Sequence, residues 1–169
     1  MKNIVAIDVG NSETTVGVGN NLSWKSYRYT TRKTITSDEL FMMFKTTIDL
    51  DSINDEKLDG SIICSVVPQI TESVVEATER FTSKKVYTVG PGIKTGLKVN
   101  IDNPKELGPD RIANSVGGFK MSQKSVIIVD LGTATTFDVV NDKKEYLGGS
   151  IAPGIKISLE ALTTKTSSL

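Results

Sequence analysis

The chain has 169 residues, a length that can bury one hydrophobic core or two small lobes sharing a seam. Its 20 basic and 20 acidic residues balance and only 6% of its residues are aromatic, so neither nucleic acid nor an acidic membrane surface is an expected partner. Histidine is absent, so acid–base chemistry should use carboxylates, with lysine or tyrosine as weaker candidates, and a bound metal should be a hard cation held by oxygen.

The single cysteine, Cys64, lies in an apolar run, and we expect a small buried side chain rather than a reactive thiol. No run approaches the roughly 20 apolar residues of a membrane helix. The N-terminus leads directly into a strand pattern, without the regions of a signal peptide. The sequence therefore predicts a cytoplasmic protein.

The first part of the chain predicts a mixed sheet covered by helices. Thr36 or Ser37 should cap the first helix, since acidic residues follow in its first turn. The apolar face of that helix comprises Leu40, Phe41, Phe44 and Ile48. The expected strands are residues 2–9, 14–19, 24–29, 59–67 and 85–89, and the expected helices begin at 36–37 and span 69–82.

After a turn-rich stretch at 90–104 and a helix at about 110–120, the strand pattern restarts. Three strands are expected at 125–130, 134–140 and 145–151, followed by an opening helix. This order repeats that of the first part, so we expect an ancient duplication. The division predicted from it is a first lobe at 1–121 and an incomplete second lobe at 122–169.

Two turns carry the first chemical signal. Each apolar strand ends in an aspartate, Asp8 or Asp130, with a glycine two residues later and small hydroxyl or amide side chains beyond it. A carboxylate at a turn can organise a cation, and glycine backbone lets phosphate oxygens approach closely. Alternatively, each aspartate bonds only its own turn and each glycine merely adopts a positive φ. No Walker-type phosphate loop is present.

A second signal lies at Gly108-Pro109-Asp110-Arg111, where a helix begins. Asp110 could accept a hydroxyl proton while Arg111 binds an anionic substrate through its planar fork, aided by the helix N-terminus. The structural alternative is that Asp110 is the N-cap and Arg111 a solvated charge.

Paired phosphate-binding hairpins resemble those of the actin, sugar-kinase and heat-shock chaperone superfamily. Its duplicated ribonuclease H-like lobes bind a nucleotide between them. Five elements taken together closely resemble type III pantothenate kinase. They are Asp-Val-Gly-Asn-Ser at 8–12, Gly-Pro-Gly-Ile-Lys-Thr-Gly at 90–96, Gly-Pro-Asp-Arg at 108–111, Asp-Leu-Gly-Thr-Ala-Thr-Thr at 130–136 and Gly-Gly-Ser-Ile-Ala-Pro-Gly at 148–154.

The resemblance implies ATP-dependent phosphorylation of pantothenate, the first step toward coenzyme A, by a homodimer. It implies Asp110 as general base, Asp130 as the site of potassium or ammonium, and Asp8 as the organiser of magnesium. The residues implied in ATP binding are Asp8, Val9, Gly10, Asn11, Ser12, Glu13, Thr14, Thr15 and Thr133. Those implied in pantothenate binding are Gly108, Pro109, Asp110 and Arg111.

Some positions depart from the family pattern. Ser12 replaces the usual threonine, Pro109 the common alanine, and Ile101 a tyrosine that contacts substrate in many relatives. Family chains also continue well past residue 169, so we expect a truncated, split or fragmentary chain. Apolar positions in its last helix, Ile155, Ile157, Leu159 and Leu162, are then expected to lack their packing partners.

Three alternatives remain open. A different phosphotransferase or a phosphohydrolase could use the same fold. A catalytically weak regulatory protein could retain nucleotide-shaped loops. The third alternative is a non-functional fragment whose fold persists only through dimerisation.

Overall fold

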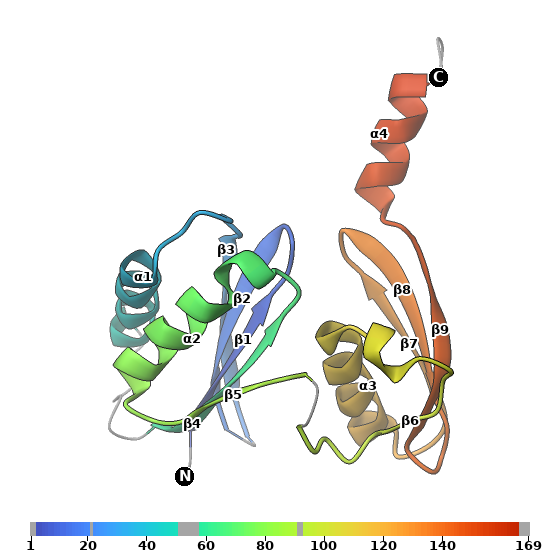
Figure 1. The fold of residues 1–169 in the computed structure, drawn as a ribbon, viewed down its shortest axis with the longest axis horizontal. Helices are drawn as coiled ribbons and strands as arrows, with labels where there is room; N and C mark the ends of the chain where they lie inside the picture. Colours follow the sequence, from blue (N-terminus) through green and yellow to red (C-terminus); the bar gives the residue numbers. More distant parts are fainter. Residues whose placement is uncertain (1–2, 21, 51–57, 91–92, 166–169) are drawn as a thin grey trace. The chain divides into compact units, whose positions relative to one another are not determined.

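The computed structural model describes residues 3–20, 22–50, 58–90 and 93–165, which form two compact units, 1–90 and 91–169. The first unit holds a five-stranded sheet in the order β3-β2-β1-β4-β5, with α1 and α2 together on one face (Figure 1). Its elements are β1 (Asn3–Val9), β2 (Glu13–Gly19), β3 (Trp24–Thr30), α1 (Ser37–Leu50), β4 (Leu58–Ser65), α2 (Pro68–Thr82) and β5 (Val86–Thr88).

This sheet is mixed, as predicted. β1 pairs antiparallel with β2 and parallel with β4, so Asp8, the second-last residue of β1, lies between Thr15 and Cys64 in register. Cys64 is buried, which confirms the sequence prediction. The central position of β1 fixes the first turn at the edge of a well-paired sheet.

The helices of this unit form for the expected reasons. Thr36 caps α1 through a reciprocal pair: its Oγ1 accepts from the Glu39 N–H at 3.3 Å, and Glu39 Oε2 accepts from the Thr36 N–H at 3.0 Å. The Glu39 pKa is lowered chiefly by that backbone hydrogen bond. Phe44 of α1 meets Phe81 of α2 edge to face, with ring centroids 6.0 Å apart. The buried core is made of Val5, Ile7, Val9, Val16, Val18, Ile35, Leu40, Phe44, Ile48, Leu58, Ile63, Val67, Ile70, Val74, Ala77 and Phe81.

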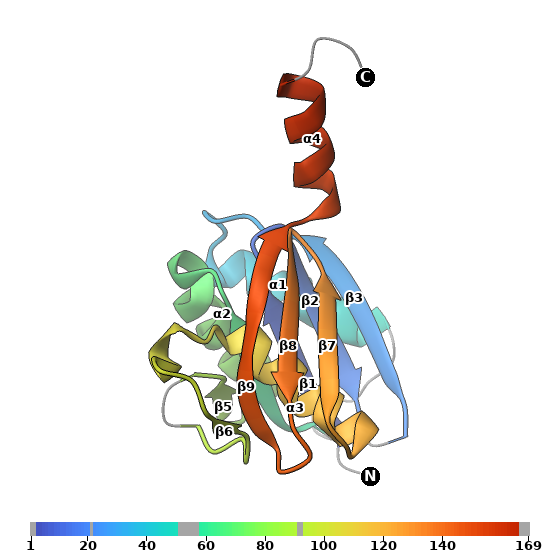
Figure 2. The ribbon, with the colours of Figure 1, turned by 90° about the vertical axis from the view of Figure 1, so that its right-hand side faces the viewer.

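The second unit holds a four-stranded sheet in the order β6-β9-β8-β7, with α3 on one face. Its other face is open in the described part of the chain (Figure 2) and exposes Ile127, Val129, Leu131 and Phe137. The elements are β6 (Lys98–Val99), a 3-10 turn (Pro104–Glu106), α3 (Pro109–Ser122), β7 (Val126–Leu131), β8 (Ala134–Val140), β9 (Glu145–Pro153) and α4 (Ile155–Lys165).

Residues 93–121 group with this second sheet, whereas the expected division placed them with the first lobe. The reason is that Ile112 and Phe119 of α3 pack onto a small core formed by Leu107, Val140 and Tyr146. The lobe division at 121/122 stays a prediction. β6 was not predicted; it pairs with β9 through Lys98 and Val99.

α4 continues beyond β9 and leads away from the sheet (Figures 1 and 2). Its apolar side chains Ile155, Ile157, Leu159 and Leu162 are exposed, as expected. No helix among the described residues is long and apolar enough to cross a membrane.

Candidate functional site

The first turn is a tight hairpin connection braced by a residue from outside the hairpin. The Gly10 N–H donates to the Glu13 carbonyl at 2.9 Å. Thr31, just after β3, donates its hydroxyl to the Gly10 carbonyl at 2.7 Å and its N–H to the Ser12 carbonyl at 2.9 Å. The Thr31 hydroxyl also lies 2.9 Å from that of Thr14. Nothing in the sequence pattern singles out Thr31.

The residues of this turn that were predicted to bind ATP differ in their exposure. Asn11, Ser12 and Glu13 are exposed beside the half-buried Gly10, so their atoms can meet a ligand. Thr14 is buried and bonds Thr31, so in the structure its hydroxyl braces the turn. The other predicted members, Asp8, Val9 and Thr15, lie in the paired ends of β1 and β2.

The second turn resembles the first but is one residue shorter, because its glycine bonds the carbonyl two residues on rather than three. The Gly132 N–H donates to the Ala134 carbonyl at 3.0 Å, and Asp130 faces Thr136 in register as Asp8 faces Thr15. Thr133 is exposed at the tip. Neither Gly10 nor Gly132 has a positive φ, so that structural alternative is wrong. A Cβ on Gly132 would meet only ordinary contacts, at 3.6 and 3.9 Å, so the chain itself does not demand glycine there.

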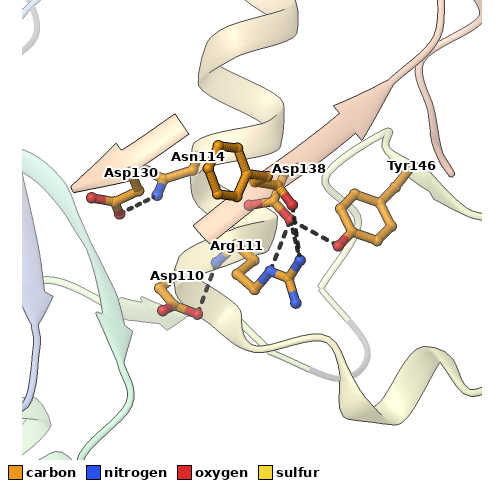
Figure 3. Close-up of polar contacts among 7 residues, drawn as sticks. Asp110, Arg111, Asn114, Asp130, Asp138 and Tyr146 are labelled. Atoms are coloured by element: carbon orange, nitrogen blue, oxygen red, sulfur yellow. Dashed lines mark hydrogen bonds and ion pairs between the residues drawn. The ribbon is translucent and has the colours of Figure 1, made fainter. Parts of the chain in front are cut away.

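Asp130 is held from the helix side. Its Oδ2 accepts a hydrogen bond from Asn114 Nδ2 of α3 at 2.8 Å (Figure 3). The carboxylate is exposed beside the turn. Asn114 is a neighbour of Asp130 that the sequence analysis did not predict.

The predicted cation sites consist of single carboxylates. The described residues contain no group of three or more acidic or cysteine side chains that could hold a metal. Magnesium that arrives with a nucleotide takes one or two protein carboxylates and completes its shell with phosphate and water. The single carboxylate of Asp8 fits a cation of that kind.

Asp110 lies in the first turn of α3, two residues after the N-cap. Gly108 is the N-cap and Pro109 the first helical residue, so the N-cap alternative for Asp110 is wrong. Asp110 Oδ1 accepts from the Arg111 N–H at 2.8 Å (Figure 3). Among the described residues no hydrogen bond reaches Oδ2. One oxygen is therefore anchored while the other can accept a proton.

Arg111 is no solvated charge, so that structural alternative is also wrong. Its Nε and Nη2 both bond Asp138 Oδ1, at 2.8 and 2.7 Å, and its side chain is only 13% exposed. Tyr146 Oη donates to the same oxygen at 2.8 Å. Burial, reinforced by this carboxylate, raises the Tyr146 pKa. A carboxylate in mid-strand was the available signal for Asp138, because strands rarely hold aspartate without a partner.

These residues divide between the two units. The second unit contains Asp110, Arg111, Asp130 and Thr133, and α3 connects three of them: Asp110 and Arg111 lie in its first turn, and Asn114 bonds Asp130. The predicted residues Asp8 to Thr15 belong to the first unit. The second unit thus contains the residues predicted as general base, as donor to an anionic substrate and as ligand of a monovalent cation.

Solved structures define the class of protein. A Ppx/GppA phosphatase from Aquifex aeolicus matches with a TM-score of 0.53 at 14% identity, over 95% of this chain and 55% of that one. The ethanolamine utilization protein EutJ from Carboxydothermus hydrogenoformans matches with a TM-score of 0.50 at 10% identity, over 97% and 57%. The fold is that of the actin-like ATPases and sugar kinases, with duplicated lobes of which the second is incomplete here.

Sequence comparison then gives the family. The model of the type III pantothenate kinase family matches residues 4–169. A type III pantothenate kinase of Syntrophotalea carbinolica is 43% identical over 168 residues, 98% of this chain and 66% of that protein. The chain belongs to the type III pantothenate kinase family, and it spans 65–66% of the length of the first curated relatives it matches.

Proposed function

We propose that the protein containing this chain transfers a phosphoryl group from ATP to pantothenate, giving 4'-phosphopantothenate in the first step of coenzyme A biosynthesis. Family membership supports this reaction. We also propose that it acts in the cytoplasm as a homodimer, as the family resemblance implies.

The observation that carries the proposal is the anchored carboxylate of Asp110. The Arg111 N–H fixes Oδ1, which leaves Oδ2 to take the proton of the primary hydroxyl. As that proton moves to Oδ2, the hydroxyl oxygen bonds the γ-phosphorus and the bond to the leaving ADP oxygen breaks. Phosphoryl transfer needs mainly positioning and charge neutralisation, so a carboxylate base is sufficient.

The substrate's carboxylate is assigned to Arg111 and the start of α3. α3 has 14 residues, and its N-terminus adds a favourable potential for an anion. Gly108 and Pro109 form the backbone approach to this end of the helix. Base and anion donor are thus adjacent residues on one rigid element.

The nucleotide phosphates are assigned to the two turns, through residues 8–15 and Thr133. Magnesium organised through Asp8 and potassium or ammonium at Asp130 would neutralise phosphate charge. Two observations support this assignment. The tips of both turns are exposed, and the protein's own packing does not require glycine at position 132, so a close approach of phosphate can explain it.

A coupled ATP-turnover assay with and without pantothenate tests the function. Potassium-dependent turnover that requires pantothenate is expected. Turnover without pantothenate would indicate a phosphohydrolase, and no turnover would favour the regulatory or fragment alternatives.

The Asp110→Asn variant tests the base. It should lower kcat by about 10²- to 10⁴-fold while ATP binding stays nearly intact. Asp142→Asn, on an exposed turn of the same unit, is the matched control and should retain wild-type turnover. Loss of ATP binding in Asp110→Asn would instead make Asp110 a nucleotide-site residue.

A further inference from the structure

Asp138 is a fully buried carboxylate in the middle of β8, a strand that α3 covers. Its Oδ1 alone receives three bonds, from Arg111 Nε at 2.8 Å, Arg111 Nη2 at 2.7 Å and Tyr146 Oη at 2.8 Å (Figure 3). Its Oδ2 is also buried, and no hydrogen-bond partner reaches it among the described residues.

This arrangement is a poor way to stabilise the fold. A buried ion pair costs desolvation of both charges, and a buried oxygen without a partner adds a further cost. An apolar pair of similar volume would fill the same space without either cost. The arrangement is better explained by what it does to the guanidinium.

Two of the three guanidinium nitrogens of Arg111 are hydrogen-bonded within the protein. Nε bonds Asp138, and Nη2 bonds both Asp138 and the Phe137 carbonyl, the latter at 3.3 Å. Gly149 of β9 makes room for this position, because a Cβ there would lie 2.3 Å from Nη2. Nη1 is the only guanidinium nitrogen without a bond among the described residues (Figure 3).

We propose that Asp138 is the positioning residue of Arg111, holding the guanidinium so that Nη1 alone meets the substrate's carboxylate. The inference rests on the proposed function. We expected Arg111 to bind the substrate through two nitrogens. Because Nε and Nη2 already bond Asp138, only one nitrogen, Nη1, can donate to the substrate.

Steady-state kinetics of the protein at its natural length test this role. Asp138→Asn should raise KM for pantothenate about 10- to 100-fold, because misplacement by about 1 Å costs that much. KM for ATP should stay within about twofold. Pantothenate primary amide, which lacks the negative charge, is the matched substrate: the variant should change its KM little, so discrimination between the two substrates collapses. Asp142→Asn should keep wild-type discrimination.

Equal increases in KM for pantothenate, its amide and ATP would overturn the positioning role, because a merely structural loss affects all three. Tyr146→Phe is a milder variant that removes one donor and keeps the ion pair. It should raise KM for pantothenate by less than about threefold.

An NMR measurement tests whether Asp138 holds the Arg111 guanidinium, and it does not depend on enzymatic activity. The Arg111 Nε–H, assigned by its loss in Arg111→Lys, should exchange with water far more slowly than that of Arg28, whose side chain is 75% exposed. Asp138→Asn should remove that protection. Fast exchange in the wild type would refute the positioning role even in an active kinase. A slow-exchanging Arg111 in a protein that does not phosphorylate pantothenate would refute the proposed function alone.

Discussion

Replacing Gly154 by alanine tests how the second turn is held. Gly154 precedes α4, and its N–H donates to the Thr133 carbonyl at 3.2 Å. A Cβ there would lie 2.4 Å from the Thr133 carbonyl oxygen and 2.5 Å from that of Gly132. Both obstacles are backbone atoms of the turn assigned to phosphate, so no side-chain rotation can relieve the contact.

The size of the effect follows from these distances. Ordinary contact of a Cβ begins at 3.4 Å, so the turn must move by about 1 Å. Overpacking of this kind costs about 1–3 kcal/mol, and each kcal/mol lowers Tm by about 2–4 °C in a chain of this size. A shift of about 1 Å at a phosphate-binding backbone should weaken ATP binding by about 10- to 100-fold.

Gly117→Ala is the matched control. Gly117 lies inside α3 of the same unit, and a Cβ there would meet nothing within 4 Å. Alanine is the better helix former by about 1 kcal/mol, so this variant should gain stability and bind ATP normally. The same substitution should therefore have opposite signs at the two positions.

Thermal unfolding and calorimetric titration with magnesium-ATP measure both quantities. A Gly154→Ala variant as stable as Gly117→Ala would refute the packing argument. A destabilised variant with wild-type ATP affinity would refute the assignment of the second turn to the nucleotide while leaving the packing argument intact.

Two further variants separate the roles of buried and exposed groups in the second unit. The Tyr146 pKa is raised in the folded state, so its stabilising contribution is complete below pH 10, the ordinary tyrosine value, and falls as pH rises above it. In urea unfolding the advantage of wild type over Tyr146→Phe should therefore decline by up to about 1.4 kcal/mol per pH unit above pH 10, and a pH-independent difference would contradict this. Asp130→Asn can still accept the hydrogen bond of Asn114, so it should fold normally yet lose the stimulation of turnover by potassium, whereas retained stimulation would place the cation elsewhere.

The elements that sequence predicted well are those with strong local patterns. The first strand of each hairpin carries a run of four apolar residues, at 4–7 and 126–129, and Thr36 with Glu39 marks the start of α1. β6 has two residues and pairs with a strand 47 positions later, so no local period reveals it. α3 follows the first sheet in the chain but packs onto the second, because core contacts rather than chain order decide its place.

At the candidate site, too, sequence predicts local motifs but not contacts between residues far apart in the chain. Asp110 and Asp130 stand in recognisable motifs, but their neighbours depend on distant pairings: Arg111 meets Asp138 across 27 positions and Thr14 meets Thr31 across 17. Sequence predicts that a charged residue in a strand needs a partner, but not which partner. The expected fork of Arg111 was therefore reasonable from its chemistry, whereas its fork nitrogens bond Asp138 and the Phe137 carbonyl in the fold.

The paired turns share an aspartate and a glycine but differ in length and in surroundings. Each has an aspartate opposite a threonine and a glycine N–H that closes the loop. Asp8 lies near the end of a strand that is paired on both sides, whereas β7, which carries Asp130, pairs among the described residues only with β8. The polar neighbour of Asp130 is the amide of Asn114 on a helix. Since a cation's preference depends on such neighbours, the shared aspartate and glycine do not require the same cation at both turns, and the proposed magnesium at Asp8 and potassium or ammonium at Asp130 are compatible with one sequence pattern.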